Sequence, residues 1–174
     1  MYRVLILAFL SNIICASDIK LPMSFSSSFE QIVTNPKKKV IRYRGDLKFV
    51  YPSIIKWHYT KPTQKDVCSD SEHITVVDYD LEQVSLYYLN KRFNIAKILS
   101  NAKYYKKNIY IAKYQDKSYT IALDSHNRLE SMAYYDDLDN KVQIIFRKVS
   151  YRDKPFSSRV MRCNIPKDYD IIKG

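Results

Sequence analysis

Glycine is nearly absent from this chain of 174 residues, which holds only Gly45 and Gly174. Neither residue belongs to a GxGxxG or GxxxxGK sequence, so the glycine loops that bind nucleotide phosphates are excluded. The scarcity also excludes collagen-like repeats and glycine-rich linkers. Turns must be made by other residues. The Asn and Asp residues between the apolar segments fit this role because they tolerate left-handed backbone conformations.

Long apolar runs are also missing, except for a short one near the start of the chain. Arg3 precedes an apolar stretch, and no further charge follows until Asp18. The stretch is shorter than the roughly 20 residues that a membrane-spanning helix needs, and its profile is typical of a secretory signal peptide. We expect a signal peptide over residues 1–16, cleaved after Ala16 or Ser17, and a single domain over residues 17–174.

Cysteine is scarce as well, with three residues in all. Cys15 follows Ile14, whereas a lipid-attachment site has a small residue before its cysteine, so we expect an exported protein of the periplasm without a lipid anchor of its own. Cys68 and Cys163 remain after export. They permit one disulfide, and two buried free thiols are the alternative.

Acidic residues are outnumbered, with 18 Asp and Glu against 29 Lys and Arg, a formal net charge of +11. Loss of Arg3 leaves 28 basic and 18 acidic residues, a net charge of about +10. The 16 tyrosines could stack on nucleic-acid bases. No nucleic-acid-binding motif is present, however, and the export signal argues against such a partner. A basic surface that faces anionic lipid or acidic proteins is the competing interpretation.

Catalytic and metal-binding patterns are weak. The three histidines, His58, His73 and His126, are scattered, and no GxSxG motif exists. Cys68 and His73 supply only two metal ligands. The acidic residues of 136–140 lack the glycine and distal Glu of a calcium loop, and those of 78–82 are more simply a solvated turn. We therefore expect no enzyme, cofactor or metal.

Apolar residues alternate with polar ones along most of the chain, which indicates short strands rich in β-branched and aromatic residues. Two segments depart from this pattern. Phe25, Phe29, Ile32 and Val33 recur at helical spacing, and the apolar residues of 93–99 suit a second short helix. The chain thus predicts one long antiparallel sheet, curled into a half-barrel and interrupted by a few helices.

One face of this sheet would be apolar. The alternating positions that could line its concave side are Leu47, Phe49, Ile55, Trp57, Ile74, Val76, Val84, Leu86, Ile121, Leu123, Ile144 and Phe146. They could bind a hydrophobic ligand or simply form a filled core, and periodicity does not separate these two interpretations.

Several segments resemble one known family. Residues 45–47 and the run YPSIIKWHYTKP at 51–62 are similar to the outer-membrane lipoprotein carrier family, LolA. So are FSSSFEQ at 25–31 and LEQV at 81–84. The late segments 124–137 and 165–172 also resemble this family, and the order of these motifs covers essentially the whole mature chain.

The resemblance implies an incomplete antiparallel β-barrel with helices that form a lid over a hydrophobic cavity. It implies that Phe25, Phe29 and Ile32 belong to a helix under the lid, and that residues 93–99, with Phe93, Ile98 and Leu99, form the central lid. Many family members have an Arg at the position of Tyr51, where it bonds to the lid. Because a Tyr hydroxyl has a single donor and no charge, we expect the lid here to be held by apolar contacts.

The resemblance also implies a function and partners. Such a carrier takes triacylated lipoproteins released by an inner-membrane ABC transporter, LolCDE, and brings them to an outer-membrane receptor, LolB. We expect a monomeric periplasmic carrier of this kind. Two alternatives are a LolB-like receptor, which Ile14 disfavours, and a periplasmic sensor or interaction domain on the same half-barrel.

Overall fold

The computed structural model describes residues 19–70, 72–88 and 94–173. The predicted signal peptide and Phe93 lie outside these residues. Within them, the strands are β1 (Ser24–Thr34), β2 (Val40–Val50), β3 (Ile54–Lys61), β4 (Lys65–Ser69), β5 (His73–Asp78), β6 (Gln83–Tyr88), β7 (Lys103–Lys106), β8 (Ile109–Tyr114), β9 (Lys117–Leu123), β10 (Leu129–Tyr135), β11 (Lys141–Arg152) and β12 (Asp170–Lys173). The helices are α1 (Ile95–Ser100) and α2 (Ser158–Met161).

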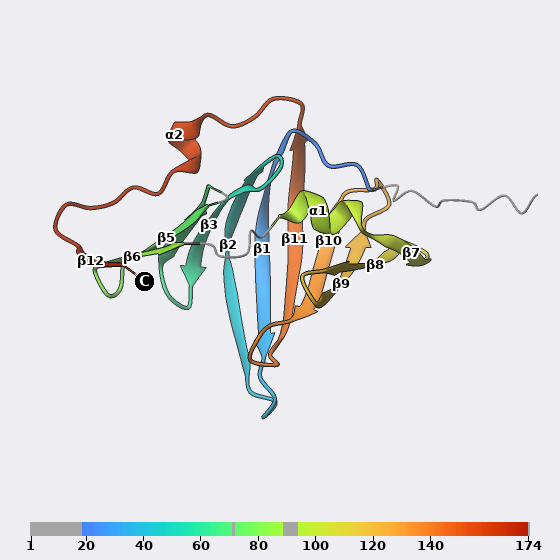
Figure 1. Cartoon of the computed structure of the whole chain (residues 1–174), viewed down its shortest axis with the longest axis horizontal. Helices are drawn as coiled ribbons and strands as arrows, with labels where there is room; N and C mark the ends of the chain where they lie inside the picture. Colours follow the sequence, from blue (N-terminus) through green and yellow to red (C-terminus); the bar gives the residue numbers. More distant parts are fainter. Residues whose placement is uncertain (1–18, 71, 89–93, 174) are drawn as a thin grey trace, which may run out of the picture.

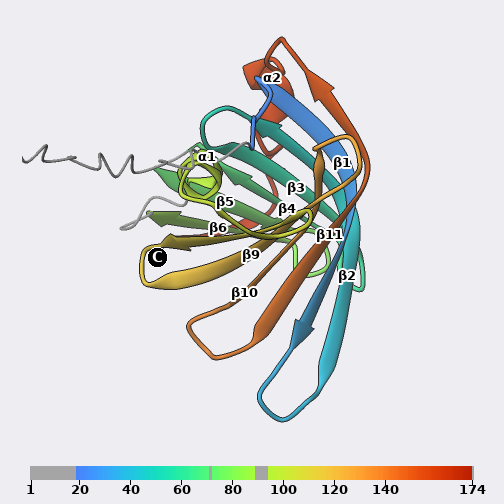
Figure 2. The same cartoon turned by 90° about the vertical axis from the view of Figure 1, so that its right-hand side faces the viewer.

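All the described strands belong to one sheet of order β12-β6-β5-β4-β3-β2-β1-β11-β10-β9-β8-β7. Neighbours pair antiparallel, except that β12 runs parallel to β6. Figure 2 shows the sheet bent into an open arch, with α1 on the inner side of the curve. The sheet does not close, because β12 and β7 stand at opposite edges (Figure 1). The mainly-β, open half-barrel architecture is therefore confirmed.

The first segment is a strand, and the expected helix at Phe25–Val33 is wrong. β1 pairs with β2 on one side and with β11 on the other, in the middle of the sheet. Phe25, Phe29 and Val33 are spaced by four residues, which is an even number and so fits a strand as well as a helix. The residues between them on the same face are Ser27 and Gln31, whose polarity concealed the alternation.

The second expected helix is present as α1. It begins at Ile95 and ends at Ser100, one residue after the end of the predicted segment 93–99. The side chain of Asn94 caps its first turn by accepting a hydrogen bond from the backbone N–H of Lys97 at 2.9 Å. Ile95, Ile98 and Leu99 share the buried face of the helix. The pattern of apolar residues in this segment therefore identified both the helix and its packing face.

Asn and Asp do replace glycine in the turns. Asn108, Asp116, Asn127 and Asp139 all adopt positive φ angles, between 56° and 61°. Gly45 serves a different purpose. A Cβ atom there would collide with the main-chain carbonyl of His58, so glycine lets β2 and β3 approach closely at a break in their register.

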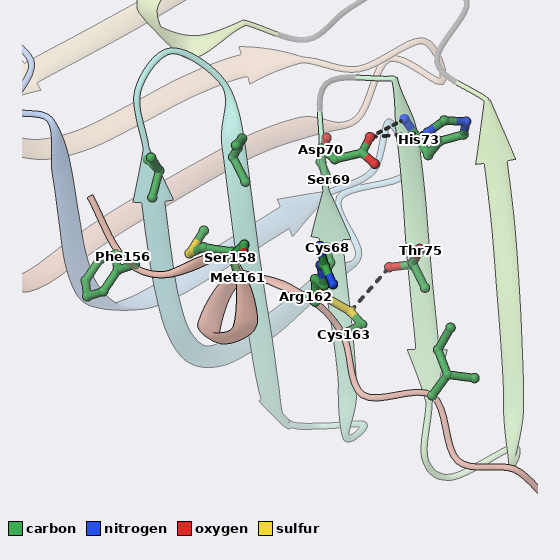
Figure 3. A pocket seen from close by; sticks show the side chains of 13 residues that line it. Cys68, Ser69, Asp70, His73, Thr75, Phe156, Ser158, Met161, Arg162 and Cys163 are labelled. Atoms are coloured by element: carbon green, nitrogen blue, oxygen red, sulfur yellow. Dashed lines mark hydrogen bonds and ion pairs between the residues drawn. A yellow bond between two sulfur atoms is a disulfide. The ribbon is translucent and has the colours of Figure 1, made fainter.

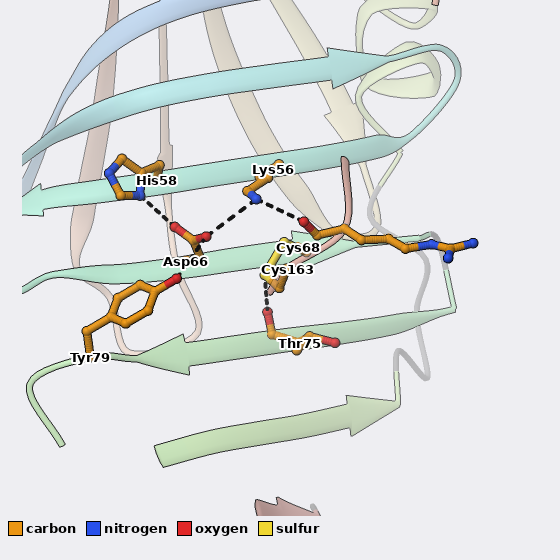
Figure 4. Close-up of a disulfide and its surroundings, with 8 residues drawn as sticks. Lys56, His58, Asp66, Cys68, Thr75, Tyr79 and Cys163 are labelled. Atoms are coloured by element: carbon orange, nitrogen blue, oxygen red, sulfur yellow. Dashed lines mark hydrogen bonds and ion pairs between the residues drawn. A yellow bond between two sulfur atoms is a disulfide. The ribbon is translucent and has the colours of Figure 1, made fainter. Parts of the chain in front are cut away.

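The segment after β11 crosses from the middle of the sheet to its far edge on the convex side. α2 lies along this path, and Cys163 forms a disulfide with Cys68 of β4, with a Cα–Cα distance of 5.7 Å (Figure 4). The disulfide joins residues 95 positions apart in the sequence. It decides between the two states that the sequence left open for these cysteines.

Among the described residues, no helix is both long enough and apolar enough to span a membrane.

Candidate functional site

The concave face of the sheet carries the main apolar cluster. Pairing registers place alternate residues of each strand on this face. The predicted members of the cluster are Phe25, Phe29, Leu47, Phe49, Ile55, Ile98, Leu99, Ile121, Leu123, Ile144 and Phe146, with Trp57 packed against it. Ile95, from the expected helical segment, also belongs to it. The structure adds residues that the sequence analysis did not select: Ile19, Ala102, Ala112, Tyr119, Leu129, Met132 and Val142.

Aromatic side chains form the centre of this face. The ring centroid of Phe29 lies 4.7 Å from that of Trp57 and 5.2 Å from that of Tyr59, both in edge-to-face geometry. The hydroxyl of Tyr59 donates a hydrogen bond to Oε1 of Gln31 at 3.0 Å. Burial raises the pKa of Tyr59 above its ordinary value, so its phenol stays neutral. The phenol is thus uncharged, and the nearby charge is cationic, because Nζ of Lys65 lies 5.0 Å from the ring centroid of Tyr59.

The helix α1 packs on one half of the concave face. Ile98 and Leu99 are 0% and 1% exposed, and they belong to the same buried cluster as Ile121 of β9. The helix has only six residues, so packing rather than helix propensity holds it in place. The half of the face on β1, β2 and β8–β11 is therefore filled by the protein's own side chains in this state.

The other half of the concave face is less covered. The register from Trp57 through Val67 to Val76 continues the concave row onto β4 and β5. Val67, Ile74 and Val76 are half-buried and lie outside the main cluster, and Tyr87 of β6 is 46% exposed. In the described part of the chain, these residues form a partly accessible apolar strip on the concave face of β4, β5 and β6. We call them the concave strip.

Three predicted lining residues lie on the opposite face. Val84 pairs with Val77 and Leu86 with Thr75, which places both on the convex side with Cys68. Ile32 pairs with Arg42 and Gln143 on the convex side of β1. Alternation shows that Val84 and Leu86 share a face, but it does not show which face of the sheet they share. The assignment of Val84 and Leu86 to the concave face is wrong, and so is the placement of Ile32 in a helix under the lid.

Tyr51 lies beside the helix. It lines a pocket of about 450 Å³ together with Pro52, the segment around Ile19 and Leu21, and the α1 residues Ala96, Lys97, Leu99 and Ser100. Its side chain is 51% exposed. The structure gives its hydroxyl no hydrogen bond within the described residues, whereas its backbone N–H donates to the carbonyl of Met23 at 2.9 Å. Tyr51 thus borders α1, but its hydroxyl forms no hydrogen bond with the described residues of the helix.

The convex face has a polar centre at Asp66, which is only 5% exposed. Its carboxylate contacts Nδ1 of His58 at 2.6 Å and Nζ of Lys56 at 3.4 Å, and it accepts a hydrogen bond from the hydroxyl of Tyr79 at 3.3 Å (Figure 4). Burial and the charge of Asp66 raise the pKa of Tyr79. Lys56 also donates to the carbonyl of Arg162 at 2.9 Å. This cluster ties the crossing segment to β3 and β4.

A pocket of about 510 Å³ opens between the crossing segment and the convex face (Figure 3). The crossing segment contributes Phe156, Met161 and Ile165 to its lining, and the sheet contributes Val50 and Ile54. The disulfide forms one of its walls. The pocket is separated from the concave face by the thickness of the sheet.

The weak catalytic and metal-binding patterns have structural explanations. Cys68 is disulfide-bonded and cannot pair with His73 as a ligand. Asp136 accepts hydrogen bonds from the backbone N–H groups of Leu138 and Asn140, each at 2.9 Å, which fixes a hairpin turn. Among residues 19–70, 72–88 and 94–173, no group of three or more metal-ligating side chains is assembled.

Comparison with known proteins gives consistent matches. The family model described as "Outer membrane lipoprotein carrier protein LolA" matches residues 22–128. The chain is 31% identical over 150 residues to an outer-membrane lipoprotein carrier protein of Campylobacter jejuni, with 86% of each chain covered. It is 29% identical to one of Wolinella succinogenes, covering 71% of this chain and 72% of the relative.

The fold also matches a solved structure. An uncharacterized conserved protein from Thermus thermophilus superimposes with a TM-score of 0.56 at 7% identity, covering 88% of this chain and 92% of the other. At this identity the likeness concerns the fold alone.

Proposed function

This chain belongs to the outer-membrane lipoprotein carrier family, LolA, and we propose that it shields the acyl chains of lipoproteins during their transport to the outer membrane. The need for shielding is physical, because each exposed CH₂ group of an acyl chain costs about 0.8 kcal/mol in water. The single observation that carries the proposal is the apolar concave face, half closed by α1 and half accessible.

The concave strip is the proposed entry point for acyl chains. Val67 and Val76 lie in one row that continues to the aromatic centre at Trp57, and Ile74 lies in the neighbouring row, which continues through Ser69 to Ile55. A ligand that lay along the first row would reach the aromatic centre of the concave face. The convex pocket is the weaker candidate, because polar groups such as Asp70 and His73 line it and the crossing segment is fixed there by a disulfide.

The lid is α1 in this proposal. In the state described, Ile98 and Leu99 occupy the space that cargo would take. Opening would expose these side chains to the acyl chains, so part of the binding energy is used to displace the helix. The same exchange favours release, because the empty carrier recovers its own apolar contacts when the helix closes again.

The partners follow from the same role. We propose that triacylated lipoproteins are the cargo, that a LolCDE-like inner-membrane ABC transporter supplies them in the periplasm, and that a LolB-like receptor accepts them. No catalytic step is needed, because the cargo is moved without a change in its covalent structure.

The experiment is release from spheroplasts. Protein lacking residues 1–16 is added to spheroplasts that are synthesising labelled lipoproteins, and the soluble fraction is analysed. The proposal predicts labelled lipoproteins in a soluble complex with the added protein. If lipoproteins stay in the membrane fraction at every protein concentration, the carrier function is excluded.

A further inference from the structure

The edge strand β7 has an unusual surface. All four of its residues are exposed, and the side chains of Tyr104 and Tyr105 are 63% and 66% exposed. Lys103 and Lys106 stand on either side of them. β7 is the outermost strand at its end of the sheet and follows α1 with only Asn101 and Ala102 between (Figure 1).

The charge around this strand has one sign. Residues 94–114 contain five lysines and no Asp or Glu. These lysines are Lys97, Lys103, Lys106, Lys107 and Lys113. Within the described chain, none of them forms an ion pair with a carboxylate, whereas Lys117 on the next strand pairs with Asp137 at 2.9 Å. Leu123 donates its backbone N–H to the carbonyl of Asn108 in the β7–β8 turn, and the acidic residue that follows it, Asp124, is already paired with Arg128 at 3.0 Å.

We propose that residues 103–107, which we call the basic aromatic edge, bind the surface of an anionic phospholipid bilayer. Tyrosine side chains are favoured at membrane interfaces because the ring is apolar and the hydroxyl stays hydrated. Lysines near an anionic leaflet add electrostatic attraction that falls off within a Debye length. The edge offers both kinds of side chain on an exposed strand, with an uncompensated positive charge that complements anionic headgroups.

The basic aromatic edge follows α1 closely in the chain, so membrane binding at the edge would place the proposed lid near the bilayer. Asn101 ends the helix, and its side-chain amide donates to the carbonyl of Lys113 on β8 at 3.3 Å. A bilayer bound at residues 103–107 would therefore lie within a few residues of the proposed lid. Contact with the membrane would bring the end of α1 close to the lipid phase from which acyl chains leave or into which they enter.

A simpler role for the lysines is the protection of an open sheet edge against pairing with other strands. That role requires no lipid and does not use exposed tyrosines. Vesicle binding separates the two roles. The vesicle assay contains no lipoprotein, so an absence of vesicle binding would not contradict the proposed carrier function.

The test uses purified protein lacking residues 1–16 and vesicles of either phosphatidylglycerol with phosphatidylethanolamine or phosphatidylcholine alone. Co-sedimentation measures binding at low and high salt. We expect binding to the anionic vesicles only, weakened by salt. The triple variant Lys103→Gln/Lys106→Gln/Lys107→Gln should bind at least about 10-fold more weakly, since each lysine near an anionic surface contributes about a fivefold gain.

Two matched controls separate the edge from the general positive charge. Lys37→Gln/Lys38→Gln/Lys39→Gln removes the same charge from an exposed turn elsewhere and should change binding by less than about twofold at moderate salt. Tyr104→Ser/Tyr105→Ser should weaken binding, while Tyr88→Ser/Tyr135→Ser, which alters tyrosines 71% and 61% exposed, should not. Thermal unfolding of each variant verifies that the fold is kept.

Three results would overturn the proposal. The first is equal binding of the protein to anionic and neutral vesicles, or to neither. The second is an equal loss of binding in the two lysine variants, which would assign the effect to net charge. The third is unchanged binding in Tyr104→Ser/Tyr105→Ser, a variant that alters only exposed side chains and so should fold even if the lysine variant does not.

Discussion

Asn101 joins the end of α1 to the sheet, because its side-chain amide donates a hydrogen bond to the main-chain carbonyl of Lys113 on β8 at 3.3 Å. The buried face of the helix is apolar and consists of Ile95, Ile98 and Leu99. Apolar packing and the exposed polar tether at Asn101 therefore both hold the proposed lid.

Removal of this tether should loosen the lid. Asn101→Ala keeps the backbone but deletes the hydrogen bond, which at an exposed site contributes about 0.5–1 kcal/mol. The empty protein should bind a fluorescent fatty acid about two- to fivefold more tightly, because closure competes less with the probe. Asn164→Ala, at an exposed position between α2 and β12, is the control and should have no effect. Weaker probe binding in Asn101→Ala would contradict this view of α1.

The hydroxyl of Tyr51 should be dispensable. It forms no hydrogen bond among the described residues, although the side chain borders α1 across a pocket of about 450 Å³. Tyr51→Phe keeps the ring and its apolar contacts, so lipoprotein uptake from spheroplasts and release to outer membranes should stay at the unmodified level. A large defect in either step would show that the hydroxyl does latch the lid.

The disulfide should stabilise the fold and have no effect on ligand binding at the concave face. Cys68 and Cys163 close a loop with a sequence separation of 95 residues, for which chain-entropy arguments give about 4–5 kcal/mol. Cys68→Ser/Cys163→Ser should therefore lower the free energy of unfolding substantially, as measured by urea denaturation. Reduction of the unmodified protein is the internal control and should give the same loss.

The location of the disulfide sharpens this prediction. Because it lies on the convex face, fatty-acid binding by the folded fraction of the double variant should be unchanged. Loss of binding at temperatures where the variant is still folded would show that the two faces are coupled.

Stability at high pH should depend on Tyr134. Burial, with a smaller contribution from the nearby Tyr119, raises the pKa of Tyr134 to about 12. The resulting stabilisation is fully present below the ordinary tyrosine pKa near 10, and it is lost as the pH rises from there through the folded-state value. Tyr134→Phe should reduce the loss of unfolding free energy between pH 9 and 11 by about 1 kcal/mol.

The exposed neighbour provides the comparison. Tyr135 is 61% exposed, so Tyr135→Phe is the matched control that removes a phenol from the surface and not from the buried face. Identical alkaline profiles for Tyr134→Phe and the unmodified protein would show that Tyr134 titrates normally in the folded state.

Much of the sheet follows from alternation within single strands. Leu47 with Phe49, and Ile55 with Trp57, were placed correctly on one face because their strands are central and one side packs on the core. The turns were predictable too, since Asn and Asp residues mark them in a chain with almost no glycine. These features depend on neighbours in the sequence.

The errors have a common cause in long-range pairing. Ser27 interrupts the apolar row of β1, yet it is buried. Its hydroxyl tolerates burial because it donates a hydrogen bond to the carbonyl of Arg147, which is 120 residues away. Val84 is fully buried on the convex face, the side to which the crossing segment is bonded through Cys163 and Cys68. No local pattern indicates which face a distant segment will cover, so the positions of Ile32, Val84 and Leu86 could not be read from spacing.

The central claim is that acyl chains bind on the concave face, and site-specific photocrosslinking tests it most directly. A photoreactive amino acid replaces either Val76 on the concave strip or Leu86 on the convex face, two half-buried positions on neighbouring strands. Each protein is then incubated with spheroplasts that make lipoproteins with labelled acyl chains. We predict a labelled crosslink at Val76 and none at Leu86. Crosslinking at Leu86 with none at Val76 would contradict the assignment of the concave face as the lipid-binding site.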